Sequence, residues 1–97
     1  MINVLCVYTV KEGQEDAFRG ILKDHAELLR ARDLISDQPV QAFQDSRDKR
    51  IFIEVFQWKD QNSINRAHTA EGVGPIWDRM EAVVESIRAL HPVPIAD

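Results

Sequence analysis

Hydrophobic and polar residues follow two different periods along the chain, and each change of period marks the boundary of an element. Residues 2–10, INVLCVYTV, alternate with a period of two and are rich in β-branched side chains, which predicts a strand ending at a Lys-Glu-Gly turn. From residue 14 the apolar positions recur every 3.6 residues, which predicts an amphipathic helix over residues 14–31. The buried stripe of this helix consists of Phe18, Ile21, Leu22, His25, Leu28 and Leu29.

The middle of the chain predicts a hairpin. Residues 33–39 contain Ser, Asp and Pro and break the helical period. Two strands are predicted after them, over residues 40–44 and 50–58, and the polar residues 45–49 form the loop between them. A short polar helix is predicted next, over residues 61–68.

The last third of the chain carries the clearest helical stripe, which predicts a helix over residues 73–90. A proline at position 75 suits the first turn of a helix, and the prolines at positions 92 and 94 prevent its continuation. Residues 91–95 are predicted to form a short strand, which the two prolines confine to a sheet edge. The stripe consists of Val73, Ile76, Trp77, Met80, Val83, Val84, Ile87 and Leu90.

The predicted order β-α-β-β-α-(β) is that of the ferredoxin-like split βαβ fold, an α+β architecture with helices on one face of an antiparallel sheet. A chain of 97 residues has room for one domain, residues 1–97. No internal repeat divides it further.

Both faces of the predicted sheet are apolar. Along residues 50–58, alternation separates Ile51, Ile53, Val55 and Gln57 from Phe52, Glu54, Phe56 and Trp58. A sheet covered by helices on one side normally has a polar second side. The second apolar face therefore predicts a homodimer that packs sheet to sheet. Alternation alone leaves open which face carries Glu54.

Charge and cysteine content exclude several classes of protein. Twelve basic and sixteen acidic residues give a net charge of −4 with no basic cluster, which argues against nucleic-acid binding. No apolar run approaches the roughly 18 residues that span a bilayer, and the N-terminus lacks signal-peptide features, so the expected location is cytoplasmic with no membrane association. Cys6 is the only cysteine and is interpreted as a core residue, with a reactive thiol as the alternative.

The run from residue 52 to residue 80 resembles the antibiotic biosynthesis monooxygenase family of the dimeric α+β barrel superfamily. The resemblance extends over about residues 2–88 and includes the segment VKEGQEDAF after the first strand. It implies a homodimer whose protomers face their sheets together, with a small pocket between sheet and helices. It also implies a cofactor-independent monooxygenase acting on a small phenolic or quinol-like substrate. The residues that carry it are Glu54 and Trp58 at the end of a strand, Ala67 and His68, Trp77, and His25 on the first helix.

Such an oxygenase needs a base, a dry cavity and an oriented substrate. The predicted catalytic residues are His68, His25 and Glu54. No metal site is expected, because no helix carries a His-x-x-x-His or Glu-x-x-His pair. The resemblance implies that no cofactor is used. The predicted substrate-binding residues are Trp58, Trp77, Phe52 and Phe56.

Each of these residues also has a structural interpretation. His68 could cap a helix junction, His25 could be a hydrogen-bonded core histidine, and Glu54 could form a structural ion pair. The aromatic residues could be core alone. Two further functions therefore stay open: a non-catalytic dimer that binds a small ligand, and a base-catalysed isomerase or decarboxylase.

Overall fold

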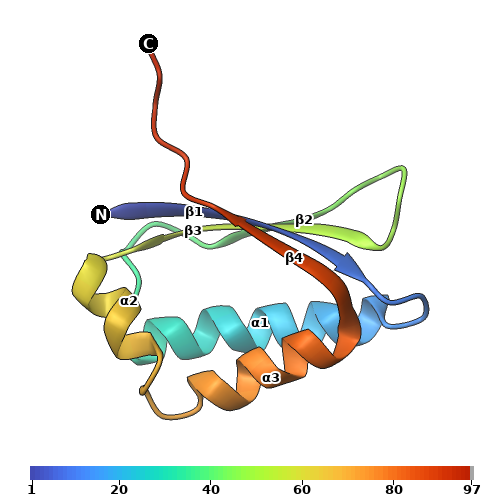
Figure 1. Ribbon diagram of the computed structural model, residues 1–97, viewed down its shortest axis with the longest axis horizontal. Helices are drawn as coiled ribbons and strands as arrows, with labels where there is room; N and C mark the ends of the chain where they lie inside the picture. The colour runs from blue at the N-terminus through green and yellow to red at the C-terminus, as the bar shows by residue number, and fades with distance from the viewer. Residues whose placement is uncertain (97) are drawn as a thin grey trace.

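In the computed structural model, which describes residues 1–96, an antiparallel four-stranded sheet is covered on one face by three helices (Figure 1). The strand order β2-β3-β1-β4 is that of a ferredoxin-like α+β fold, which confirms the predicted class. None of the helices within residues 1–96 is long and apolar enough to cross a membrane. The elements are β1 (Ile2–Val10), α1 (Glu15–Ala31), β2 (Gln41–Gln44), β3 (Ile51–Trp58), α2 (Gln61–Ala67), α3 (Val73–Val83) and β4 (Val84–Leu90).

The prediction for the C-terminal third was wrong in its second half. Helix α3 ends at Val83, and residues 84–90 form strand β4, which pairs antiparallel with β1 from Val84 opposite Val10 to Leu90 opposite Leu5. The strand predicted at residues 91–95 is absent, because residues 91–96 have no regular secondary structure. Apolar residues spaced by three satisfied the helical period locally, but the second edge of β1 carries backbone groups that need a hydrogen-bonding partner, and β4 supplies it.

The core lies between the sheet and the helices. Strand β3 alternates strictly between half-buried and buried residues, and its buried set is Phe52, Glu54, Phe56 and Trp58. The open question about Glu54 is thereby answered: it lies on the helix-covered face and is 1% exposed. Helix α1 contributes the apolar part of its predicted stripe, with His25 buried among it.

Within residues 1–96, no helix covers the opposite face of the sheet (Figure 1). Leu5, Val7, Ile53 and Val55 are half-buried on this face. Strand β2 places Phe43, which is 52% exposed, opposite Ile53. The sequence analysis predicted that a second copy of the chain packs against this apolar outer face.

Two helix starts have clear local causes. The Asp60 carboxylate caps α2 by accepting the Ser63 backbone N–H at 2.7 Å, and this hydrogen bond lowers the pKa of Asp60. Helix α3 begins after Gly72, whose φ of 87° suits glycine, and a Cβ at this position would lie 3.2 Å from Leu28 of α1. This close approach holds the start of α3 against α1.

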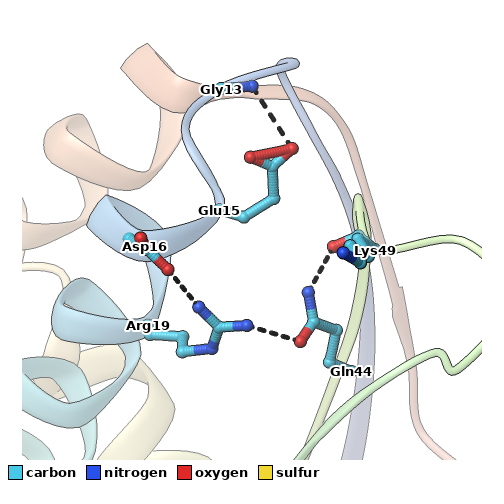
Figure 2. Close-up of polar contacts among 6 residues, drawn as sticks. All are labelled: Gly13, Glu15, Asp16, Arg19, Gln44 and Lys49. Atoms are coloured by element: carbon cyan, nitrogen blue, oxygen red, sulfur yellow. Dashed lines mark hydrogen bonds and ion pairs between the residues drawn. The ribbon is translucent and has the colours of Figure 1, made fainter.

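A polar network at the surface joins the start of α1 to the hairpin of β2 and β3 (Figure 2). Arg19 donates to Gln44 Oε1 at 2.6 Å and also pairs with Asp16. Gln44 Nε2 in turn donates to the Lys49 carbonyl oxygen at 2.7 Å. We call Asp16, Arg19, Gln44 and Lys49 the exposed network.

Candidate functional site

Four side chains from four elements form a continuous hydrogen-bonded network between the sheet and the helices. The Tyr8 hydroxyl of β1 donates to Glu54 Oε1 at 2.8 Å, and Glu54 Oε2 of β3 lies 3.0 Å from His25 Nδ1 of α1. The Trp77 indole N–H of α3 donates to His25 Nε2 at 3.2 Å. Glu54 and His25 are 1% and 3% exposed. We call Tyr8, Glu54, His25 and Trp77 the buried network.

The hydrogen-bond partners fix the tautomer of His25. Indole N–H is a donor only, so His25 Nε2 must act as the acceptor toward Trp77. The ring proton of a neutral imidazole then resides on Nδ1 and is donated to Glu54 Oε2. His25 therefore has its lone pair on the side of Trp77 and a carboxylate behind it, the arrangement in which an imidazole can accept a proton and have its positive charge stabilised.

Tyr8 serves this network only as a donor. Burial, together with the neighbouring Glu54 carboxylate, raises the pKa of Tyr8 far above its usual range, so the hydroxyl keeps its proton. Its ring is fixed by packing against Phe18, with ring centroids 4.8 Å apart. Tyr8 thus holds one carboxylate oxygen of Glu54 while the other faces His25.

A cavity of about 350 Å³ lies beside the buried network, between the sheet and helices α2 and α3. Its walls are mainly aromatic and aliphatic, and His25, His68 and Tyr8 are among the lining residues that carry polar groups. This combination of an apolar wall and a few converging polar groups is typical of small-molecule sites. The lining residues from the predicted site are His25, Phe56, Trp58, His68 and Trp77.

Two predicted site residues lie elsewhere. Phe52 does not line this cavity; it packs edge-on against Phe18 at 5.3 Å and borders a separate groove of about 400 Å³ between α1 and β2. Glu54 borders that groove too, and it reaches the cavity of His25 only through its hydrogen bond. His68, at the end of α2, is exposed and packs edge-on against Trp77, with ring centroids 5.5 Å apart.

Sequence reasoning missed three contributions to the site. Tyr8 alternates with the apolar residues of its strand and is not among the predicted site residues, although a tyrosine sharing a face with a buried glutamate is a natural hydrogen-bond donor to it. Ile87, assigned to a helix, lines the cavity from β4, and so does His91 just after that strand. His25, His68 and His91 are widely separated in the sequence, yet all three line the same cavity.

The described residues provide neither a metal-ligating cluster nor an acidic thiol at this site. Within residues 1–96, no group of three or more His, Cys, Asp or Glu side chains is arranged to hold a metal ion. Cys6 lines the cavity but is 8% exposed, and burial, the largest cause, raises the pKa of its thiol to about 11. A thiol with this pKa stays protonated near neutrality, which favours its interpretation as a core residue.

Comparison with known proteins places the fold. No protein-family model matches the sequence, and no curated protein matches it. Among solved structures, an antibiotic biosynthesis monooxygenase matches with a TM-score of 0.76 and 18% identity, over 97% of this chain and 100% of that chain. PA3566 from Pseudomonas aeruginosa matches with a TM-score of 0.77 and 19% identity, over 96% and 94% of the two chains.

A variant of SnoaB, a cofactor-independent oxygenase from Streptomyces nogalater, matches with a TM-score of 0.83 and 12% identity. The match covers 99% of this chain and 94% of SnoaB. Identities of 12–19% establish likeness of fold rather than of activity. The strand order, the helix-covered sheet face and these full-length matches together lead to one conclusion: this protein has the fold of the antibiotic biosynthesis monooxygenases.

Proposed function

We propose that this protein is a monooxygenase that uses neither metal nor flavin and acts on a small phenolic or quinol-like substrate. The observation that carries the proposal is the Glu54–His25 pair, which sets His25 with Nδ1 toward the carboxylate and Nε2 on the side of the aromatic cavity. The likeness of fold to SnoaB, a cofactor-independent oxygenase, supports the reaction class.

In the proposed reaction His25 is the base. Nε2 takes the proton of a substrate hydroxyl, and the imidazolium that forms is stabilised by Glu54 at 3.0 Å. The resulting phenolate is electron-rich and passes one electron to O₂. Recombination forms a C–O bond, and loss of water leaves a quinone. One oxygen atom of O₂ enters the product and the other enters water, so a phenol and O₂ balance a quinone and water without an external reductant.

The remaining predicted residues have separate roles in this proposal. Trp58 and Phe56 form aromatic walls against which a flat substrate stacks. His68, exposed at the cavity, returns protons to solvent. Phe52 supports Glu54 from the neighbouring groove and does not touch the substrate.

The direct test is O₂ uptake by the purified protein with a panel of phenols and hydroquinones. The key variant is His25→Gln, since its amide N–H can still donate to Glu54 although it has no basic nitrogen. We expect activity to fall by at least roughly 100-fold in His25→Gln, with the melting temperature nearly unchanged. Gln44→Ala is the comparison variant, because Gln44 belongs to the exposed network and does not line the cavity, so its activity should stay near that of the wild type.

Each other outcome selects one of the alternative functions. Ligand binding without O₂ uptake would sink the oxygenase proposal in favour of a non-catalytic binding protein. Turnover of the ligand at constant O₂ would favour an isomerase or decarboxylase that uses the same base.

We also propose that two copies pair through the apolar outer face. The support is the half-buried set Leu5, Val7, Ile53 and Val55, together with the exposed Phe43. Full burial of an exposed side chain of this kind contributes roughly 1.5–3 kcal/mol, and each half-buried residue would gain part of that amount. Ile53→Lys should convert a dimer to a monomer in sedimentation experiments, whereas Asn62→Lys, at an exposed position of helix α2 on the other side of the sheet, should not. A wild-type protein that sediments as a monomer at high concentration would refute the dimer.

A further inference from the structure

The lone pair that the proposed base would use is already occupied. His25 Nε2 accepts the Trp77 indole N–H at 3.2 Å, and His25 is only 3% exposed. A substrate hydroxyl that donates to Nε2 must therefore take the place of the indole N–H. Trp77 lines the cavity as well, so the indole stands where a ligand would reach the base.

We propose that Trp77 is a specificity-determining residue: its indole N–H caps His25 Nε2, and only an aromatic ligand that bears an O–H or N–H donor displaces the cap and reaches the base. This inference rests on the proposed function, in which His25 is the base. It adds a requirement on the ligand and a role for the indole N–H beyond that of an aromatic wall.

The cap selects ligands by their ability to donate a hydrogen bond to His25 Nε2. Nε2 of this buried imidazole is an acceptor, and leaving a buried acceptor unpaired costs roughly 5- to 100-fold in an equilibrium constant. A hydroxylated ligand replaces the indole N–H one for one, so the exchange leaves no unpaired group on His25. An ether or ketone offers no donor, so it occupies the cavity with the cap closed or leaves Nε2 unpaired.

The surroundings of Trp77 allow the indole to move. Trp77 is half-buried, and the side chain of His68 beside it is exposed. An indole that releases His25 can therefore find water for its N–H, which a fully buried tryptophan could not do. Glu54, in contrast, is almost fully buried and does not line the cavity, so it offers no comparable freedom to move.

The test compares two probes of nearly equal shape, 1-naphthol and its methyl ether 1-methoxynaphthalene, by calorimetric binding to the whole protein. The measured quantity is the ratio of the two dissociation constants, ether over naphthol, which cancels aromatic contacts common to both. Trp77→Phe keeps a ring but removes the N–H, so naphthol no longer has a hydrogen bond to displace. We expect this ratio to rise roughly two- to tenfold in Trp77→Phe relative to wild type.

Trp58→Phe is the matched control, because Trp58 also lines the cavity but does not donate to His25. Its ratio should stay at the wild-type value. A second measurement follows the Trp77 indole N–H in ¹⁵N-labelled protein, assigned by its loss in Trp77→Phe. Naphthol should shift this resonance and speed its exchange with solvent, and the ether should leave it unchanged.

Three results would overturn the proposal: a ratio that is the same in Trp77→Phe and wild type, a naphthol complex with an unperturbed indole resonance, or no naphthol binding at millimolar concentration. None of these measurements involves turnover. Displacement of the indole without O₂ uptake would leave the role of Trp77 intact and remove only the oxygenase reaction, so the two failures are distinguishable.

Discussion

Two hydrogen-bonded networks of four residues connect helix α1 to the sheet, and they differ in their access to water. The buried network has contacts of 2.8–3.2 Å around Glu54 and His25, which are almost fully buried. The exposed network has contacts of 2.6 and 2.7 Å around Gln44, and the side chains of Arg19 and Asp16 are 52% and 97% exposed (Figure 2). The shorter contacts belong to the network that water can replace.

Bond length is therefore a poor guide to energetic importance here. When an exposed partner is removed, water satisfies the group left behind, so the loss is small. When a buried partner is removed, the remaining donors and acceptors stay unpaired in a medium of low dielectric. The comparison therefore predicts that substitutions in the buried network lower the free energy of unfolding more than substitutions in the exposed network.

The largest effect is expected for Glu54→Ala. This change leaves both the Tyr8 hydroxyl and the His25 Nδ1–H without an acceptor, and each buried unpaired group costs about 1–3 kcal/mol. We expect the free energy of unfolding, measured by urea titration, to fall by about 2–6 kcal/mol. Glu54→Gln should cost less, because the amide oxygen still accepts one of the two hydrogen bonds. A loss below 1 kcal/mol for Glu54→Ala would refute the difference between the networks.

A smaller effect is expected for Tyr8→Phe, which removes one hydroxyl and keeps the ring packed on Phe18. A hydrogen bond to a carboxylate contributes about 1.5–3 kcal/mol, so the unfolding free energy should fall by about this amount. His25 should also lose part of its fixed orientation, which ¹⁵N chemical shifts of its ring report directly. Unchanged stability together with unchanged ring shifts would show that Tyr8 is not part of a working network.

The burial of the Cys6 thiol, on the same strand as Tyr8, should make the stability of the protein depend on pH. Its pKa is raised from 9.0 to about 11, so the folded state favours the protonated thiol. Stability from this group is fully present below pH 9 and is lost as the pH rises toward 11; at pH 10 the loss amounts to roughly 1 kcal/mol. Cys6→Ala should remove that part of the pH dependence. At pH 8 the native thiol should react with iodoacetamide about 100-fold more slowly than in urea.

The smallest effect is expected in the exposed network. Gln44→Ala removes its contacts with both Arg19 and Lys49, yet the guanidinium and the carbonyl can turn to water. The unfolding free energy should fall by about 0.5–1 kcal/mol, less than the loss from the single hydroxyl of Tyr8. If Gln44→Ala proves more destabilising than Tyr8→Phe, burial does not determine how much these contacts contribute to the free energy of unfolding.

The sequence predicted the first five elements to within two residues at each end, because each has a clear period and a clear break. Its one large error, residues 84–90, has a physical origin. Val84, Ile87 and Leu90 fit a helical stripe, and nothing within the segment shows that the edge of β1 lies beside it. The choice between helix and strand was made by pairing with residues about 80 positions away in the chain.

In the candidate site, too, local patterns predicted which face each residue lies on but not which residues pair. Periodicity placed His25 on the buried stripe of α1, and alternation placed Glu54 with Phe56 and Trp58. That Glu54 pairs with His25, and that Tyr8 and Trp77 complete the network, could not be predicted. These hydrogen bonds join residues separated by 46, 29 and 52 positions, and local patterns contain no information about such partners.

By itself, then, the sequence determined which residues of the first five elements share a face and where these elements begin, because side-chain periodicity is a property of the local backbone. Only the tertiary structure decided that the face with Glu54 meets the helices, that residues 84–90 extend the sheet, and that one histidine has its lone pair beside an aromatic cavity. The physical reason is that burial and hydrogen-bond pairing are settled between elements. A buried carboxylate is tolerated only where folding brings donors to both of its oxygens.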